Sequence, residues 1–145
     1  MRLAVTTTAL ALVAVATLAA VAGSDPAAAP ESGRPAAVRT ITLTARHSRF
    51  TPGRVTVPVG TTVRFIIRNL DPIDHEFIVG DAATHRRHEV GRETHHHGDE
   101  AGEISVPAGT SAVTAYRITS AGPVVFGCHL PGHFAYGMRG VVVGS

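Results

Sequence analysis

The chain has 145 residues, enough for one domain with a modest core but too few for two well-packed domains. It has 13 arginines, no lysine and 11 acidic residues. This near balance, without a basic stripe interleaved with aromatic side chains, argues against nucleic-acid binding. A single cysteine excludes an internal disulfide framework, a Cys-x-x-Cys redox pair and c-type haem attachment.

Residues 1–22 have the features of a signal peptide. Arg2 precedes an apolar run over residues 3–22 that only threonine interrupts, and Ala20-Val21-Ala22 forms a small-x-small cleavage site. About 20 apolar residues also suffice to span a bilayer, so an uncleaved membrane anchor is the alternative, and only then would the chain contact a membrane. We therefore expect an exported, extracytoplasmic protein, either periplasmic or secreted.

Residues 23–37 are rich in Ala, Pro, Gly and Ser without periodicity, which predicts a flexible linker. In residues 38–145, apolar and polar side chains alternate with period two, the pattern of half-buried β-strands. The predicted strands are centred on residues 41–45, 55–59, 63–67, 75–79, 103–106, 111–119, 124–128 and 138–143. About eight short strands with Gly and Pro turns and no helix in the core predict an all-β, Greek-key sandwich or barrel.

Residues 80–102, GDAATHRRHEVGRETHHHGDEAG, interrupt this pattern. The segment is polar and holds five of the nine histidines, so we expect a long His-rich loop inserted into the β domain. Its histidines form a candidate second site for Cu(II) or Zn(II). They are His85, His88, His95, His96 and His97, and Glu89, Glu93, Asp99 and Glu100 of the same segment are the candidate carboxylate ligands beside them. The alternative is a solvated loop whose histidines bind nothing in common.

The segment GCHLPGHFAYGM, residues 127–138, places a thiol, an imidazole and a thioether on one short loop between the last two predicted strands. Cys128, His133 and Met138 are soft or borderline donors that together select copper over magnesium, calcium or manganese. His75, at the start of a predicted strand, is the best candidate for a second imidazole. The alternatives are a buried structural thiol, a nucleophilic Cys–His pair, or zinc, for which methionine is an unusual ligand.

The sequence resembles the cupredoxins, the small blue copper proteins, over nearly the whole predicted domain. FTPGRVTVPVGTTVRFIIRN (residues 50–69) resembles the early strands of the family, DHEF (74–77) its first-histidine motif, and CHLPGHFAYGM (128–138) its ligand loop. The resemblance implies one type 1 copper ion with His75, Cys128 and His133 as equatorial ligands and Met138 as the axial ligand.

Residues around the predicted ligands suggest further roles. Asn69 is a candidate for holding closed the loop that leads to His75, the first predicted ligand (the first-ligand loop). The alternative is that it is an ordinary turn asparagine. His129 follows Cys128 on a strand, so its side chain is predicted to point away from the copper. An apolar patch around His133 is a candidate docking surface for a redox protein. The patch consists of Leu130, Pro131, Phe134, Ala135 and Tyr136.

The sequence therefore predicts an exported, monomeric blue copper protein that carries single electrons between redox partners and is not an enzyme. A second hypothesis is a copper-handling protein for tolerance, buffering or delivery, which would use the His-rich segment as a second metal site. A third is a copper oxidase or nitrite reductase, but those families couple a blue site to a catalytic copper cluster, and this chain has no second clear ligand set.

Overall fold

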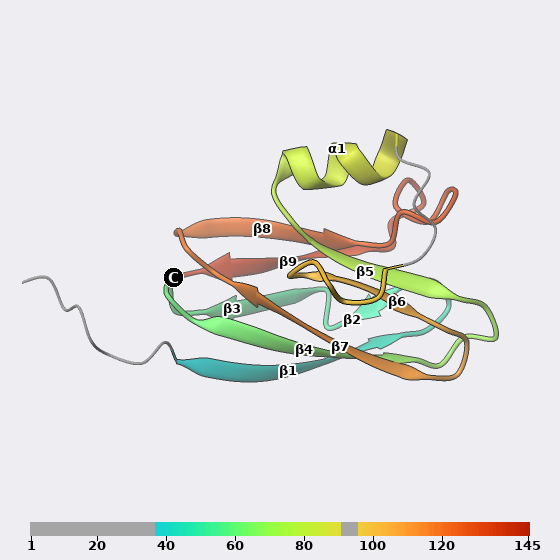
Figure 1. Cartoon of the computed structure of the whole chain (residues 1–145), viewed down its shortest axis with the longest axis horizontal. Coiled ribbons are helices and arrows are strands. Elements are labelled where there is room, and N and C mark those ends of the chain that lie inside the picture. Colours follow the sequence, from blue (N-terminus) through green and yellow to red (C-terminus); the bar gives the residue numbers. More distant parts are fainter. Residues whose placement is uncertain (1–36, 91–95) are drawn as a thin grey trace, which may run out of the picture. The chain divides into compact units, whose positions relative to one another are not determined.

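The computed structural model describes residues 37–90 and 96–145 (Figure 1). The predicted signal peptide, all but the last residue of the predicted linker, and His95 lie outside these residues. The elements are β1 (Val38–Ala45), β2 (Phe50–Thr51), β3 (Arg54–Val57), β4 (Thr62–Asn69), β5 (His75–Gly80), α1 (Ala82–Val90), β6 (Glu103–Val106), β7 (Ser111–Arg117), β8 (Gly122–Gly127) and β9 (Arg139–Gly144).

The nine strands form two sheets that pack face to face. One sheet has the order β2-β1-β4-β7 and the other the order β3-β9-β8-β5-β6. The pairs β1–β4 and β3–β9 are parallel, and the remaining pairs are antiparallel. The predicted β-sandwich is confirmed; the two-residue strand β2 was not among the predicted strands.

The core lies between the two sheets and follows the predicted alternation. In β4, Val63, Phe65 and Ile67 are completely buried, while Arg64 and Arg68 are exposed. Four phenylalanines fill the centre, with ring centroids 5.0 to 5.8 Å apart in tilted and edge-to-face contacts. They are Phe50, Phe65, Phe77 and Phe126.

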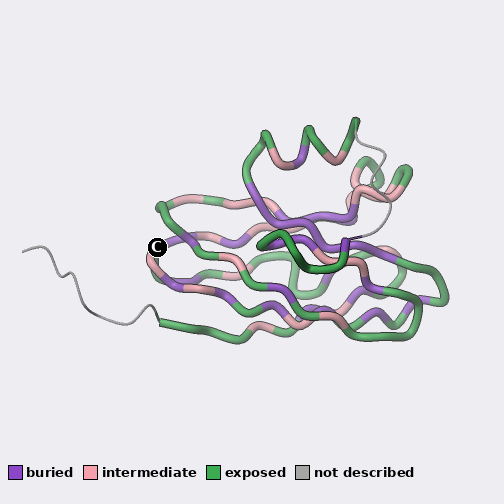
Figure 2. Tube along the Cα trace, in the orientation of Figure 1, coloured by how far each residue is buried: buried purple, intermediate pink, exposed green. Residues whose placement is uncertain are grey.

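Strand β5 is buried along its whole length (Figure 2). Alternate residues of a strand point to opposite faces of the sheet. Phe77 and Val79 belong to the core between the sheets, so His75 shares this inner face, whereas Glu76 and Ile78 face outward. Helix α1 covers this outer face of the five-stranded sheet: the His85 ring lies 3.2 Å, Nε2 to O, from the carbonyl of Val125 in β8 (Figure 1).

The prediction that the His-rich insertion is a loop is wrong in part, because nine of its residues form α1. Asp81 caps the helix: its carboxylate accepts a hydrogen bond from the Thr84 N–H at 2.8 Å, which lowers its pKa. Alanine and arginine favour the helical conformation. The helix has no apolar face by which periodicity could reveal it, because the side chains that pack on the sheet are histidines. No helix in residues 37–90 and 96–145 is long and apolar enough to cross a membrane.

Candidate metal centre

The ligand loop (residues 128–138) joins two paired strands, and its two ends therefore lie side by side. Gly127 at the end of β8 pairs with Arg139 at the start of β9. In the loop residues next to this pair, the Cys128 N–H donates to the carbonyl of Met138 at 3.1 Å. Gly132 and Gly137 have φ of +84° and +95°, a region that suits glycine, and allow the loop to fold back on itself. Residues ten positions apart thus become neighbours.

Strand β5 delivers the second imidazole. It runs antiparallel to β8 with Ile78 opposite Gly127, so its first residue, His75, lies beside the start of the ligand loop. Nδ1 of His75 is 3.3 Å from Nδ1 of His133, which in turn is 3.3 Å from the Cys128 sulfur. The ligand atoms of all three residues lie within 4.8 Å of one another.

The fourth predicted ligand, Met138, is completely buried at the same place. Its N–H donates to the carbonyl of His133 at 2.9 Å, and its own carbonyl accepts from Cys128. The structure therefore brings the four residues named from the sequence, His75, Cys128, His133 and Met138, to one end of the sandwich.

Asp71 orients His75 and was not singled out from the sequence. Its Oδ2 lies 2.8 Å from His75 Nε2, so this nitrogen carries the ring proton and Nδ1 presents its lone pair to the cluster. A carboxylate behind a ligating histidine is the common arrangement in metal sites. Burial opposes ionisation of Asp71, but hydrogen bonds from the Ser48 N–H, the His75 ring and the His47 N–H outweigh it and lower the pKa of the carboxyl group.

Asn69 is completely buried at the end of β4 and ties the first-ligand loop to β6. Its side-chain amide nitrogen lies within 3.2 Å of the carbonyls of Ile73, Val106 and Pro107. Its side-chain oxygen accepts the N–H of Asp71 at 3.0 Å. This arrangement is the one expected of a residue that holds the loop between β4 and β5 closed.

Cys128 is completely buried, and burial raises the pKa of its thiol to about 11. The Glu76 N–H points at its sulfur from 3.5 Å. A thiol of this kind stays protonated at neutral pH without a metal, which makes it a poor nucleophile. Burial and the neighbouring His75 also lower the pKa of His133, so its ring is available as a neutral ligand.

The donor set fits copper. One sulfur that can ionise, two imidazole nitrogens with free lone pairs and a buried thioether are consistent with a type 1 copper site. Donor spacings of 3.3 Å suit one ion roughly 2 Å from each donor. Of the candidate metal-binding clusters in the described residues, this is the one that contains the thiol of Cys128.

The predicted docking residues differ in their exposure. Tyr136 is 79% exposed and Pro131 is also exposed, while Leu130 and Phe134 are half-buried. Phe134 stacks on His129, with ring centroids 4.4 Å apart, and lies beneath the guanidinium of Arg139. A depression of about 450 Å³ runs beside the loop, and Leu130, Pro131 and Phe134 line it.

The four histidines of the insertion that the structure describes divide into three groups. His85 pairs with His129, Nδ1 to Nε2 at 2.8 Å, on the side of the ligand loop away from the Cys128 cluster. His88 and His96 meet Glu103, and His97 is exposed. Glu103 and its neighbour Glu76 were not anticipated as partners of these histidines, because both carboxylates belong to predicted strands and the cluster forms only when α1 folds onto the sheet. The pairing of His129 with His85 was not anticipated either.

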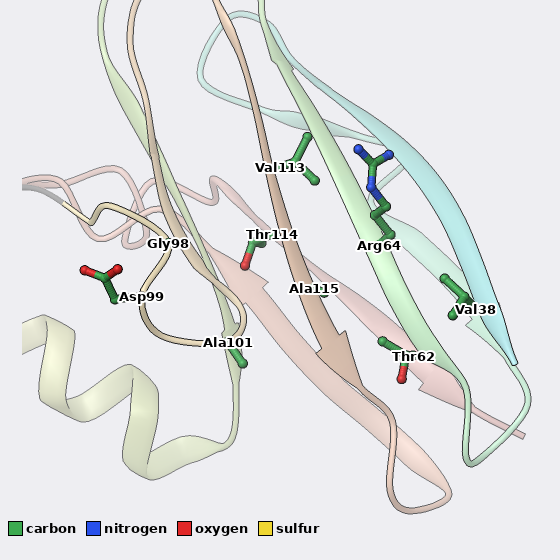
Figure 3. Close-up of a pocket in the computed structure, with 9 residues that line it drawn as sticks. All are labelled: Val38, Thr62, Arg64, Gly98, Asp99, Ala101, Val113, Thr114 and Ala115. Carbon is green, nitrogen blue, oxygen red and sulfur yellow. The ribbon is translucent and has the colours of Figure 1, made fainter. Parts of the chain in front are cut away.

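A second depression, of about 480 Å³, lies on the face of β4 and β7, and no residue of the ligand loop lines it (Figure 3). Arg64 of β4 and Asp99 of the loop before β6 are its charged lining residues, and the other lining side chains are small or apolar (Figure 3). It contains no histidine, cysteine or paired carboxylates, so we assign it no chemistry.

Three curated relatives share one name, copper-resistant cuproprotein CopI. The protein from Rubrivivax gelatinosus is 39% identical over 97 residues, which cover 66% of this chain and 59% of the relative. The Pseudomonas aeruginosa protein is 29% identical, covering 82% and 85%, and the Vibrio cholerae protein is 31% identical, covering 58% and 51%. The chain thus spans about half to six-tenths of two of these relatives.

Solved structures with the same fold include auracyanins. Auracyanin B superposes with a TM-score of 0.62 at 19% identity, covering 77% of this chain and 91% of that chain. Auracyanin from Roseiflexus castenholzii gives a TM-score of 0.61 at 21% identity, covering 75% and 98%. These likenesses establish the fold alone.

Residues 8–107 match the family model of the cupredoxin-like domain, a match that ends before the ligand loop. The match covers more than half of the chain, and the sandwich with its Cys128 cluster agrees with it. This chain belongs to the cupredoxin-like domain family.

Proposed function

We propose that this chain is an extracytoplasmic copper-handling protein, which contributes to copper tolerance by binding one copper ion for buffering or delivery. The observation that carries the proposal is the combination of a soft donor set with relatives that are all named copper-resistant cuproproteins. His75, Cys128, His133 and Met138 would hold the ion. The proposed location rests on the apolar segment at residues 3–22, which has the features of an export signal.

The chemistry of the centre suits copper storage. When copper is bound, it would supply a redox-active ion whose thiolate and thioether donors also stabilise Cu(I). The residues of the chain supply a preformed site in which Asp71 fixes the His75 ring and the Glu76 N–H faces the sulfur. The high pKa of the thiol means that copper has to displace a proton, so the affinity falls as the pH falls.

The test is copper tolerance in the source organism. Deletion of the gene should make growth sensitive to added copper, and the wild-type gene should restore tolerance. The Cys128→Ser variant should not restore it, whereas Thr119→Ser, an exposed change at the opposite end of the sandwich, should. Normal tolerance in the deletion strain would refute the proposal.

A single-electron carrier is the second candidate, and the partial exposure of His133 beside apolar side chains favours it. An electron carrier would be monomeric and would dock a redox protein at Leu130, Pro131, Phe134 and Tyr136. In that case Tyr136→Ser, which leaves the donors intact, should slow electron exchange with the partner without affecting copper tolerance. Neither role is enzymatic: both need only binding of the ion or transfer of one electron.

A further inference from the structure

A second cluster of histidines and carboxylates lies on the outer face of the five-stranded sheet, beneath α1. Ligand atoms of His88, His96 and Glu103 lie within 4.8 Å of one another. Their side chains are only 3%, 7% and 5% exposed. Glu103 pairs with Ile78 across β5 and β6, so it shares the outward face with Glu76. This cluster and the Cys128 cluster therefore lie on opposite faces of one sheet.

The hydrogen bonding of His88 leaves a lone pair aimed at a carboxylate. Nδ1 of His88 lies 2.8 Å from the carbonyl of Thr84, and because a carbonyl only accepts, Nδ1 carries the proton. In the neutral ring Nε2 is then an acceptor, yet it lies 3.1 Å from Oε2 of Glu103, also an acceptor. Two acceptors at this distance need a proton or a metal ion between them.

His96 shows the same mismatch more strongly. Its Nδ1 lies 3.5 Å from Oε2 of Glu103, and its Nε2 lies 3.4 Å from Oε2 of Glu76. Nε2 is buried and makes no hydrogen bond. A buried polar atom without a partner loses about 1–3 kcal/mol of solvation, so a native protein rarely leaves one in place. The backbone of His96 is fixed by two hydrogen bonds with Ser105 of β6, so the ring is held at this position.

Groups around the cluster hold the carboxylates in place and leave one oxygen of each free. Oε1 of Glu103 accepts a hydrogen bond from the guanidinium of Arg87. Oε1 of Glu76 accepts the N–H of His129 at 2.6 Å. Oε2 of both residues therefore faces the histidines, and two carboxylates can balance the charge of a divalent cation. Such outer contacts that orient ligands are typical of built metal sites.

We propose that His88, His96 and Glu103 form a second metal site, with Glu76 as a further carboxylate within reach, which binds Cu(II) or Zn(II). Two imidazoles with carboxylate oxygens are the ligands that these two ions share, and the lack of thiolate and thioether disfavours Cu(I). The proposal goes beyond the copper-handling function and does not depend on it, because it rests on this cluster alone.

The experiment uses the purified chain with the Cys128 centre already filled by one equivalent of copper. Zn(II) alone is added in steps, and bound zinc is counted after equilibrium dialysis. We expect one further equivalent, and X-ray absorption should show nitrogen and oxygen neighbours without sulfur. His96→Ala and Glu103→Gln should each weaken zinc binding about 10-fold or more, since even outer contacts of metal ligands contribute 10–100-fold. His97→Ala, an exposed neighbour, is the matched control and should bind normally.

The visible band of the copper centre shows whether each variant is folded. If His96→Ala does not fold, Glu103→Gln, which is close to isosteric with the wild-type side chain, still tests the site. Failure of the wild-type chain to take up zinc beyond the filled copper centre would overturn the proposal and leave an ion-pair network. Zinc binding that His97→Ala abolishes but His96→Ala preserves would also overturn it. Because the zinc count is made in vitro, it is independent of the copper-tolerance test.

Discussion

The contact between Asp71 and His75 allows a sharp test of how the metal centre is organised. Asp71→Asn keeps the size of the side chain but replaces one carboxylate oxygen by an N–H₂ donor. In the wild type, Oδ1 accepts the His47 N–H at 2.6 Å, and Oδ2 accepts the Ser48 N–H at 2.9 Å and faces His75 Nε2 at 2.8 Å. Whichever way the amide is turned, at least one N–H group faces another donor.

The magnitude follows from these contacts. A buried donor left without an acceptor costs about 1–3 kcal/mol, so the metal-free variant should unfold with a free energy lower by about that amount. Loss of the carboxylate behind a ligating histidine should weaken copper binding about 10–100-fold. If the amide turns its N–H₂ group toward His75, the ring also loses the contact that keeps Nδ1 free of a proton.

Two assays on the same protein separate these effects. Chemical denaturation of the metal-free protein gives the loss of stability, and copper titration against a competing chelator gives the loss of affinity. Asp99→Asn, an exposed carboxylate exchanged in the same way, is the control and should change neither. A folded Asp71→Asn protein that binds copper within about twofold of the wild type would refute the view that Asp71 orients His75, since outer contacts of this kind contribute 10-fold or more.

Three further predictions concern the core, the thiol and the buried histidines. Phe77→Ala should lower the free energy of unfolding by about 3–5 kcal/mol, because the ring is completely buried among three other phenylalanines, and denaturant titration measures this. Copper binding near neutral pH should release about one proton from Cys128, whose pKa is about 11 without metal, as a pH indicator in weak buffer would show. The metal-free protein should lose stability as the pH falls from 6.5 to about 4, because burial lowers the pKa of His129 to about 4 and the unfolded chain takes up the proton first.

Each of these predictions has its own control. Phe77→Leu keeps most of the buried volume and should be less destabilised than Phe77→Ala; equal losses would contradict the packing argument. Cys128→Ser should release clearly less proton on addition of copper than the wild type does. His129→Phe retains an aromatic ring against Phe134 but cannot titrate, so its stability should depend less on pH over the same range, and an unchanged pH profile would assign the effect to other groups.

The sequence alone predicted the fold class and named the four residues that the structure brings together as the candidate copper ligands. Period-two alternation in β1 and β4 predicts a sandwich because only one face of each strand can be buried in the core. The donors Cys128, His133 and Met138 are recognisable because they come from one loop, where sequence spacing and spatial proximity coincide. The same alternation predicted that Cys128 and His129 face opposite sides, and His129 does lie outside the Cys128 cluster.

Only the tertiary structure decided what supports and surrounds those donors. Asp71 reaches His75 because the loop between β4 and β5 folds back onto the turn at His47 and Ser48. The second cluster joins His88 of α1, His96 of the following loop and Glu103 of β6, whose proximity depends on the register of β5 with β6 and on the docking of α1. Helix α1 itself lacks an apolar face, so the hydrophobic pattern carries no sign of it. Ligands that lie within one loop can be predicted from their spacing in the sequence. Ligands shared by a helix, a loop and a strand cannot, because only long-range packing brings them together.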